Sequence, residues 1–305
     1  MKKLLSISVA TLCLYIAFKQ IDLQRLTNSL SESNLFLIIL AIVITYLSFI
    51  FRSIRWKILL GSPDSLKLKQ YISSTHIGYF LNNILPFRAG DLGRAHLLSQ
   101  NSKEIKFSFL VGSLIAEKII DLWFVGLLGI FILFFGFQDI LGFQFLLLIL
   151  LLYIITTAII FGNNSVVNFI QNKFSFTQNF INGYLLVSKN RIKLGSISIL
   201  LWCSFVVYIF LILKSIGIDL TLYQYIGLTI FSSIVTSLPI TPAAIGTYHL
   251  AVIYCLNLYG INIDLAQTSA IILHSVFLLY TIISGYIFLS YENIKIKSLL
   301  NDKKN

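Results

Sequence analysis

Long apolar runs separated by short polar stretches make up most of this chain. A membrane-spanning helix needs roughly 20 apolar residues, with a range of about 17–25. By this measure the pattern predicts six crossings, at Leu4–Phe18, Leu35–Phe51, Phe107–Phe137, Ile140–Gly162, Ser196–Lys214 and Leu265–Tyr291. The first run has the basic start and apolar core of a signal peptide, but it ends without a small-residue cleavage site. We therefore interpret it as an uncleaved first helix.

Two shorter apolar segments, Tyr71–Pro86 and Ile226–Pro239, differ from these six runs. Each ends at Leu-Pro and continues through a small-residue turn into a second short segment. Such a break predicts a broken or re-entrant hairpin, because irregular backbone at membrane depth must be buried in protein or line a cavity. For the second segment, two short crossings remain an alternative.

Composition places the whole chain in the membrane class. Hydrophobic residues make up 57% and charged residues 11% of 305 residues, and the mean hydropathy is +0.87. This excludes a soluble globular surface and predicts an all-α, polytopic membrane protein with a single domain over residues 1–305 and a tail at 292–305. Cys13, Cys203 and Cys255 lie in apolar runs without metal-ligand or disulfide spacing, so we interpret them as packing residues.

The distribution of basic residues selects one topology. If the six long runs cross and both hairpins return to the side they entered from, most of the 23 lysines and arginines face the cytoplasm. The exceptions are Lys19, Arg25, Lys118 and Lys214. We expect an inner-membrane protein with both termini cytoplasmic, whose basic loops attract anionic lipid head groups rather than nucleic acid.

The two hairpin turns align without a gap at an offset of 153 residues. This predicts repeat halves at about 1–137 and 140–291, each with three crossings and one hairpin. Because three is odd, the second half inserts upside down, and the hairpins enter from opposite faces and meet near the midplane. The expected turn residues are Pro86, Gly90 and Gly93 in the first hairpin, and Pro239, Pro242 and Gly246 in the second.

The first hairpin carries the charges expected of a substrate site. Arg88, Asp91 and Arg94 follow its proline break, and Asn82 precedes it. Guanidinium groups suit bidentate binding of phosphate, and charge at membrane depth usually marks a solute path. The alternative is that both arginines are interface anchors paired with Asp91.

A second charged group lies near the middle of the predicted helix at Phe107–Phe137. Glu117 and Asp121 are four residues apart and share one helix face, with Lys118 adjoining. An internal Lys118–Asp121 ion pair that only stabilises packing is the alternative to a role in the solute path. At least one carboxylate lacks a lysine from this helix, and we expect Arg88 or Arg94 as its partner.

The remaining polar residues give weaker signals. Arg52, Arg55 and Trp56 are explained by an interfacial belt, with a lipid-phosphate role as the alternative, for which Arg55 is the candidate substrate-binding residue. The four histidines have no metal-ligand spacing, so we expect polar packing contacts, and His274 lies 153 residues after Asp121. No GxSxG, GxxxxGK[ST] or GxGxxG motif occurs, and we expect neither enzyme activity, cofactor nor metal, although an intramembrane enzyme that uses Glu117 or a histidine remains a third possibility.

The two hairpin motifs resemble the lysylphosphatidylglycerol synthase transmembrane, or flippase-like, family over nearly the whole chain. The resemblance rests on residues 82–94, NNILPFRAGDLGR, then on Glu117 and Asp121, and on residues 238–246, LPITPAAIG. It implies a protein that moves or exposes a lipid or lipid-linked molecule across the bilayer. Some relatives add a soluble aminoacyltransferase domain, which we do not expect here, so lysine transfer is not expected either. The family commonly has Pro-Gly-Gly-x-Gly and then a glutamate in the second motif, where this chain has Ala243, Ala244 and His249.

These observations together predict translocation or scrambling of an anionic or phosphate-bearing lipid. In this hypothesis Arg88 and Arg94 receive the head group, Asp91 orients one of them, and the two acids of the Phe107–Phe137 helix release it. The alternative is an accessory membrane subunit that docks a lipid-modifying or glycosyl-transferring enzyme through its basic loops.

Overall fold

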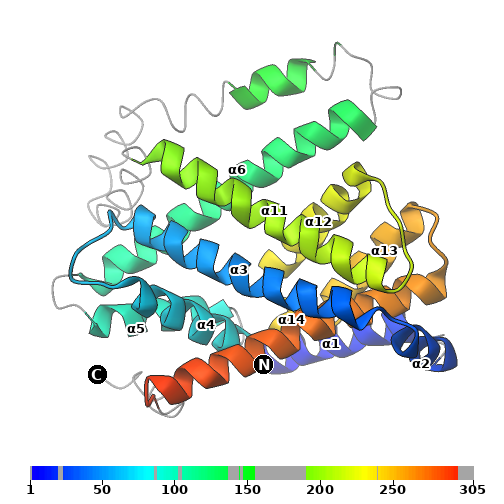
Figure 1. Cartoon of the computed structure of the whole chain (residues 1–305), viewed down its shortest axis with the longest axis horizontal. Helices are drawn as coiled ribbons and strands as arrows, with labels where there is room; N and C mark the ends of the chain where they lie inside the picture. Colours follow the sequence, from blue (N-terminus) through cyan, green and yellow to red (C-terminus); the bar gives the residue numbers. More distant parts are fainter. Residues whose placement is uncertain are drawn as a thin grey trace. The chain divides into compact units, whose positions relative to one another are not determined.

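The computed structural model describes residues 2–19, 23–85, 88–101, 105–136, 144, 147–154, 190–238 and 240–294. Within these ranges the chain is helical, and no strand occurs among them. The helices are α1 (Lys2–Phe18), α2 (Leu23–Ser31), α3 (Leu35–Leu59), α4 (Leu68–Ile84), α5 (Ala89–Gln100), α6 (Phe107–Gly136), α11 (Arg191–Ser215), α12 (Leu222–Ser237), the short 3₁₀ helix η3 (Pro242–Ala244), α13 (Thr247–Leu258) and α14 (Ile263–Tyr291), as Figure 1 shows.

Short polar residues and glycines set the helix boundaries. Asn34 precedes α3, and its side-chain Oδ1 accepts the backbone N–H groups of Phe36 and Leu37 at 3.1 and 3.3 Å. Asn262 caps α14 in the same way, accepting the N–H of Asp264 at 2.9 Å. These caps satisfy donors that a helix start leaves unpaired. The loop after α11 turns at Gly217, whose φ of 77° is accessible to glycine at little cost.

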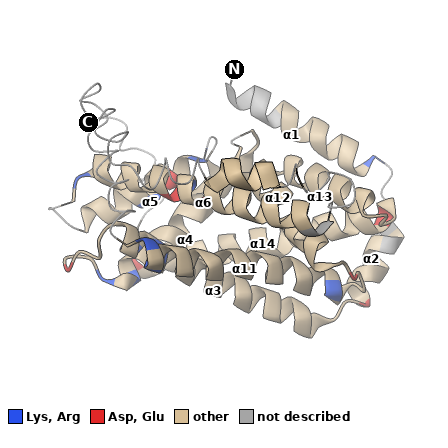
Figure 2. Cartoon of the chain, turned by 90° about the horizontal axis from the view of Figure 1, so that it is seen from above, with Lys and Arg blue, Asp and Glu red and all other residues tan. Residues whose placement is uncertain are grey.

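Three helices are long and apolar enough to cross a membrane. They are α3, α11 and α14, judged by length and composition over the described residues. They contain the predicted crossings Leu35–Phe51, Ser196–Lys214 and Leu265–Tyr291. The 30-residue α6 matches the run predicted at Phe107–Phe137, and α1 matches the first run. Figure 2 shows how few charged residues interrupt these helices.

The predicted crossing at Ile140–Gly162 lies mostly outside the described residues. Residues 147–154 are helical. Tyr153 holds them against α6, because its hydroxyl donates to the carbonyl of Trp123 at 2.6 Å and its ring lies 5.8 Å from the Trp123 ring. The number of crossings therefore remains a prediction.

The chain forms two compact units. The first unit comprises Met1–Ile50, Ile72–Leu97 and Cys203–Asn305, and the second comprises Phe51–Tyr71 and Leu98–Trp202. These units are not the two predicted repeat halves, because the first unit takes segments from both halves and contains both hairpin turns.

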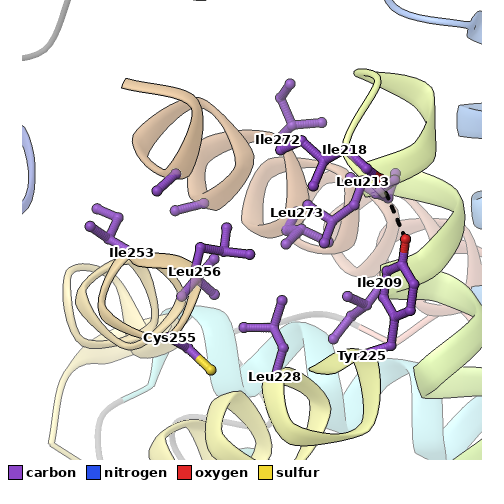
Figure 3. Close-up of a cluster of buried hydrophobic side chains, with 14 of the residues drawn as sticks. Ile209, Leu213, Ile218, Tyr225, Leu228, Ile253, Cys255, Leu256, Ile272 and Leu273 are labelled. Atoms are coloured by element: carbon purple, nitrogen blue, oxygen red, sulfur yellow. Dashed lines mark hydrogen bonds between the residues drawn. The ribbon is translucent and has the colours of Figure 1, made fainter. Parts of the chain in front are cut away.

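The core of the first unit forms where α11, α12, α13 and α14 pack together. Leu213, Leu228, Leu256 and Leu273 have no exposed surface there. Figure 3 shows these side chains pointing toward one another, with the Tyr225 hydroxyl donating to the carbonyl of Ile218 at 3.4 Å. Burying such side chains contributes about 1.5–3 kcal/mol each. Large apolar side chains on the outer faces of α3 and α14 are exposed, as expected of helices that face lipid.

Candidate functional site

The first hairpin consists of α4, which ends at Ile84, and α5, which begins at Ala89. Pro86 and Phe87 lie outside the described residues. Arg88 follows them with a φ of 53°, a left-handed conformation that is uncommon for a residue with a Cβ. Arg88 thus lies directly before α5, which begins at Ala89.

Two of the expected turn glycines lie in α5 instead of in the turn. A Cβ at Gly90 would lie 2.1 Å from the carbonyl oxygen of Gly78 and 2.6 Å from the backbone nitrogen of Asn82, both in α4. A Cβ at Gly93 would lie 2.8 Å from Leu81. The expectation that Gly90 and Gly93 form the turn is therefore wrong. They allow the backbones of α4 and α5 to approach closely.

Asp91 lies between the two arginines of the first hairpin. Its Oδ2 is 3.5 Å from Arg88 Nε and its Oδ1 is 3.4 Å from Arg94 Nε. The side-chain amide of Asn82 donates to Asp91 Oδ1 at 3.4 Å. The Arg94 side chain is fully buried, whereas those of Arg88 and Asp91 are partly exposed. Asn82, Arg88, Asp91 and Arg94 thus form one cluster with a formal excess of one positive charge.

Arg88 also connects the first hairpin to the second. Its Nη1 donates to the backbone carbonyl of Thr236 at 2.8 Å, in the last turn of α12. Carbonyls at a helix C-terminus lack intrahelical partners and carry partial negative charge, so a guanidinium group stabilises them. The cationic turn of one hairpin therefore contacts the end of the helix that leads into the turn of the other.

The second hairpin consists of α12, η3 and α13. Pro239 lies outside the described residues, and Pro242 begins η3, where its missing N–H costs nothing. Gly246 is the N-cap residue that precedes α13, with a φ of 83°, and a Cβ there would lie 2.7 Å from the Ala10 carbonyl oxygen of α1. Gly246 is thus needed both for its conformation and for the close approach of α1.

Two histidines hold this second turn together. The backbone N–H of Gly246 donates to His249 Nδ1 at 3.3 Å, which is the contact that a glutamate makes in a capping box. His274 Nε2 lies 3.0 Å from the carbonyl oxygen of Ala243, so that nitrogen carries the proton. The two rings meet edge to face, with centroids 4.7 Å apart. Both histidines therefore make polar packing contacts, as the sequence led us to expect.

Ala243 and Ala244 adopt left-handed conformations, with φ of 51° and 57°. Such conformations cost an alanine roughly 1–2 kcal/mol, because its Cβ crowds the backbone. We expect Ala243→Gly and Ala244→Gly each to stabilise the protein by about 1 kcal/mol. Thermal unfolding in detergent would measure this as a raised Tm.

Ala270→Gly provides the control for these two substitutions. Ala270 is fully buried within α14, so the same change there should lower the Tm. Equal Tm changes for the turn and the helix variants would show that the turn is not strained.

A second cluster of charges lies in the second unit. Arg52 Nη1 donates to Glu117 Oε1 at 2.8 Å, and Arg55 Nη1 donates to Asp121 Oδ1 at 2.7 Å. Arg55 Nη2 lies 3.3 Å from Glu117 Oε1, and Arg55 Nη1 lies 3.4 Å from the hydroxyl of Ser198 in α11. Arg52, Arg55, Glu117 and Asp121 are called the arginine–carboxylate cluster below.

The interfacial-belt interpretation of Arg52, Arg55 and Trp56 is wrong. All three are buried, and the indole N–H of Trp56 donates to the hydroxyl of Ser113 in α6 at 2.9 Å. The sequence contained a signal for this pairing, because a spacing of three in α3 and of four in α6 places each charged pair on one helix face. The expectation that Arg88 or Arg94 pairs with these acids stays a prediction.

The described residues offer no metal site of the usual kind. They contain no group of three or more His, Cys, Asp or Glu side chains able to hold a metal ion.

Two contacts of the first hairpin could not be predicted from the sequence. They involve the Thr236 carbonyl and Gly78, which both act through the backbone. Their roles depend on which helices meet.

Long apolar helices, two broken hairpins and buried arginine clusters together define an integral membrane protein of helical type. The chain matches the family described as the lysylphosphatidylglycerol synthase TM region over residues 3–285, and it belongs to that family. It is similar to the UPF0104 membrane protein MJ1078 of Methanocaldococcus jannaschii, with 26% identity over 242 residues, covering 74% of this chain and 98% of the relative. No solved structure matches it.

Proposed function

We propose that the protein translocates or scrambles an anionic, phosphate-bearing lipid, with the head group bound at the first hairpin. The observation that carries this proposal is the Arg88 contact with Thr236, which puts a cationic side chain at the point where the two hairpins meet. The family description names lysylphosphatidylglycerol, a lipid that carries a phosphodiester, and this supports the same class of substrate.

The partners of Arg88 in the structure are ones that a phosphate can replace. Its contact with Asp91 is long, at 3.5 Å, and its hydrogen bond to Thr236 goes to a neutral carbonyl. Hydrogen bonds from guanidinium to phosphate are charge-assisted and roughly twice as strong as neutral ones. A head group that binds Arg88 therefore competes with Thr236 and loosens the contact between the hairpins.

The buried Arg94 and the partly exposed Asp91 complete the proposed site. Arg94 supplies a second guanidinium six residues from Arg88, and Asp91 keeps both side chains oriented while the site is empty. Asn82 adds a neutral donor from α4. Arg88, Arg94 and Asn82 together offer several hydrogen-bond donors to a phosphodiester, while Asp91 limits the formal charge of the site to +1.

The predicted membrane topology is part of the proposed translocation function. Six crossings with two hairpins that enter from opposite faces give a path between the leaflets, with the charged hairpin on the cytoplasmic side and the neutral one opposite. In the neutral hairpin, Thr241 and Thr247 take the positions of Arg88 and Arg94, and their hydroxyls lie 3.1 Å apart. Both termini then face the cytoplasm, and the protein resides in the inner membrane.

Lipid exchange in reconstituted vesicles tests this function. With fluorescent phosphatidylglycerol as the probe, we expect Arg88→Ala with Arg94→Ala to lower the translocation rate to about a tenth of wild type or less, because charge-assisted hydrogen bonds to the head group are lost. Dithionite quenching of outer-leaflet probe measures the rate.

Arg191→Ala serves as the matched control, because Arg191 is an exposed arginine at the start of α11. It should keep the wild-type rate. Equal rates for the double variant and wild type would remove Arg88 and Arg94 from the site. A wild-type protein that moves no lipid and purifies with a stoichiometric lipid-modifying enzyme would favour the role of accessory subunit.

A further inference from the structure

The arginine–carboxylate cluster is buried except at one of its four side chains. The side chains of Arg55 and Glu117 have no exposed surface and that of Arg52 is 8% exposed, whereas that of Asp121 is 21% exposed. Among these four side chains, that of Asp121 is the most accessible to solvent or a ligand.

Arg55 retains donors that the structure leaves unused. Its Nη1 donates to Asp121 and Ser198, but its Nε and Nη2 are buried without a hydrogen-bond partner. Nη2 has only the 3.3 Å ionic contact with Glu117. Buried donors without partners are uncommon, and a fully buried guanidinium group with two of them points to a ligand that supplies the missing acceptors.

The charge balance of the cluster shows which group such a ligand would replace. Two arginines face two carboxylates, and Glu117 contacts both arginines. Asp121 lies at 2.7 Å from Arg55 but at 3.9 Å from Arg52. Asp121 is thus more exposed than Glu117, and its contact with the second arginine is longer. If Asp121 withdraws, the cluster loses one negative charge, and a single bound anion restores it.

We infer that Arg52 and Arg55 form a second anion site for a phosphate group, and that Asp121 occupies this site in the absence of the anion. A phosphate presents more acceptor oxygens than a carboxylate and suits the fork of a guanidinium group. It would take the place of Asp121 and accept from Arg55 Nη1, from its unused donors and from Ser198. The same chemistry is offered by free phosphate and by a lipid phosphodiester. The site belongs to the second unit and does not depend on the function proposed for the first hairpin.

Anion binding to the purified full chain in detergent tests this inference. Asp121→Asn keeps the shape of the side chain and removes its charge. By calorimetry we expect this variant to bind inorganic phosphate or dihexanoyl-phosphatidylglycerol at least about tenfold more tightly than wild type, because the competing ionic contact is gone. Adding Arg55→Gln should abolish the gain. Binding of phosphate alone identifies a free anion as the ligand, and binding of the lipid alone identifies a head group.

Two matched variants make the result specific. Asp219→Asn removes an exposed carboxylate paired with Lys214 at 2.6 Å, and it should leave anion binding unchanged. Asp121→Asn combined with Arg88→Ala and Arg94→Ala should keep the gain, which separates this site from the first hairpin. A folded Asp121→Asn variant that binds neither probe more tightly than wild type would overturn the inference and leave the cluster as a structural clamp. Loss of the gain in the combined variant would overturn it as well.

Discussion

Gly90→Ala is expected to destabilise the first unit severely and to abolish any function of its hairpins. The added Cβ would lie 2.1 Å from the Gly78 carbonyl oxygen and 2.7 Å from the Asn82 Oδ1. The first of these atoms is backbone, so no side-chain rotation relieves the clash. Overpacking usually costs about 1–3 kcal/mol, and we expect at least the upper end here, because α4 and α5 must separate. The midpoint of unfolding in mixed micelles measures the loss.

Gly129→Ala is the control for this substitution. Gly129 lies within α6, and nothing lies within 4 Å of a Cβ built there. Alanine favours a helix over glycine by about 1 kcal/mol, so this variant should be as stable as wild type or slightly more stable. A Gly90→Ala variant that unfolds at the wild-type midpoint would show that α4 and α5 are not in close contact.

Glu117→Gln is expected to have the second large effect, this time in the second unit. Glu117 is fully buried and accepts from Arg52 at 2.8 Å while facing Arg55 at 3.3 Å. A neutral amide removes the negative charge that faces both arginines. Removing one partner of a buried ion pair costs about 3–5 kcal/mol, because the remaining charge stays buried without compensation. The change in the free energy of unfolding measures this cost.

The exposed pair between Lys214 and Asp219 supplies the comparison. Its side chains are 44% and 68% exposed, so water and salt already screen the charges. Asp219→Asn should change the free energy of unfolding by no more than about 1 kcal/mol. If the two variants lose the same stability, the arginine–carboxylate cluster does not carry buried charge.

The two clusters stabilise the protein in different ways. In the first hairpin, Arg88 donates a 2.8 Å hydrogen bond to the backbone carbonyl of Thr236, and its contact with the Asp91 carboxylate is longer, at 3.5 Å. In the second unit, Arg52 and Arg55 have short contacts with carboxylates. Under the two proposals above, an anion at the first hairpin competes with the longer Asp91 contact, whereas an anion in the second unit must displace Asp121. We therefore expect faster anion exchange at the first hairpin.

The sequence by itself determined the membrane class and much of the helical pattern. Runs of apolar residues as long as a bilayer is thick have few alternatives to helices, because every backbone group in lipid must be paired within its own segment. The proline breaks likewise marked the two hairpins, and the motifs around them were sufficient to indicate the family. Charge spacing in α3 and α6 showed which side chains share a helix face.

The tertiary structure alone decided which helix faces meet. Sequence spacing does not reveal that α4 and α5 touch at Gly78 and Gly90, so both α5 glycines were assigned to the turn instead of to a helix contact. For the same reason Arg55 was placed at the interface instead of beside Asp121. The Arg88 contact with Thr236 involves a backbone carbonyl, which every residue has, so no residue type could have signalled it. Local patterns follow from the chain's own geometry, whereas these contacts follow from how the helices pack.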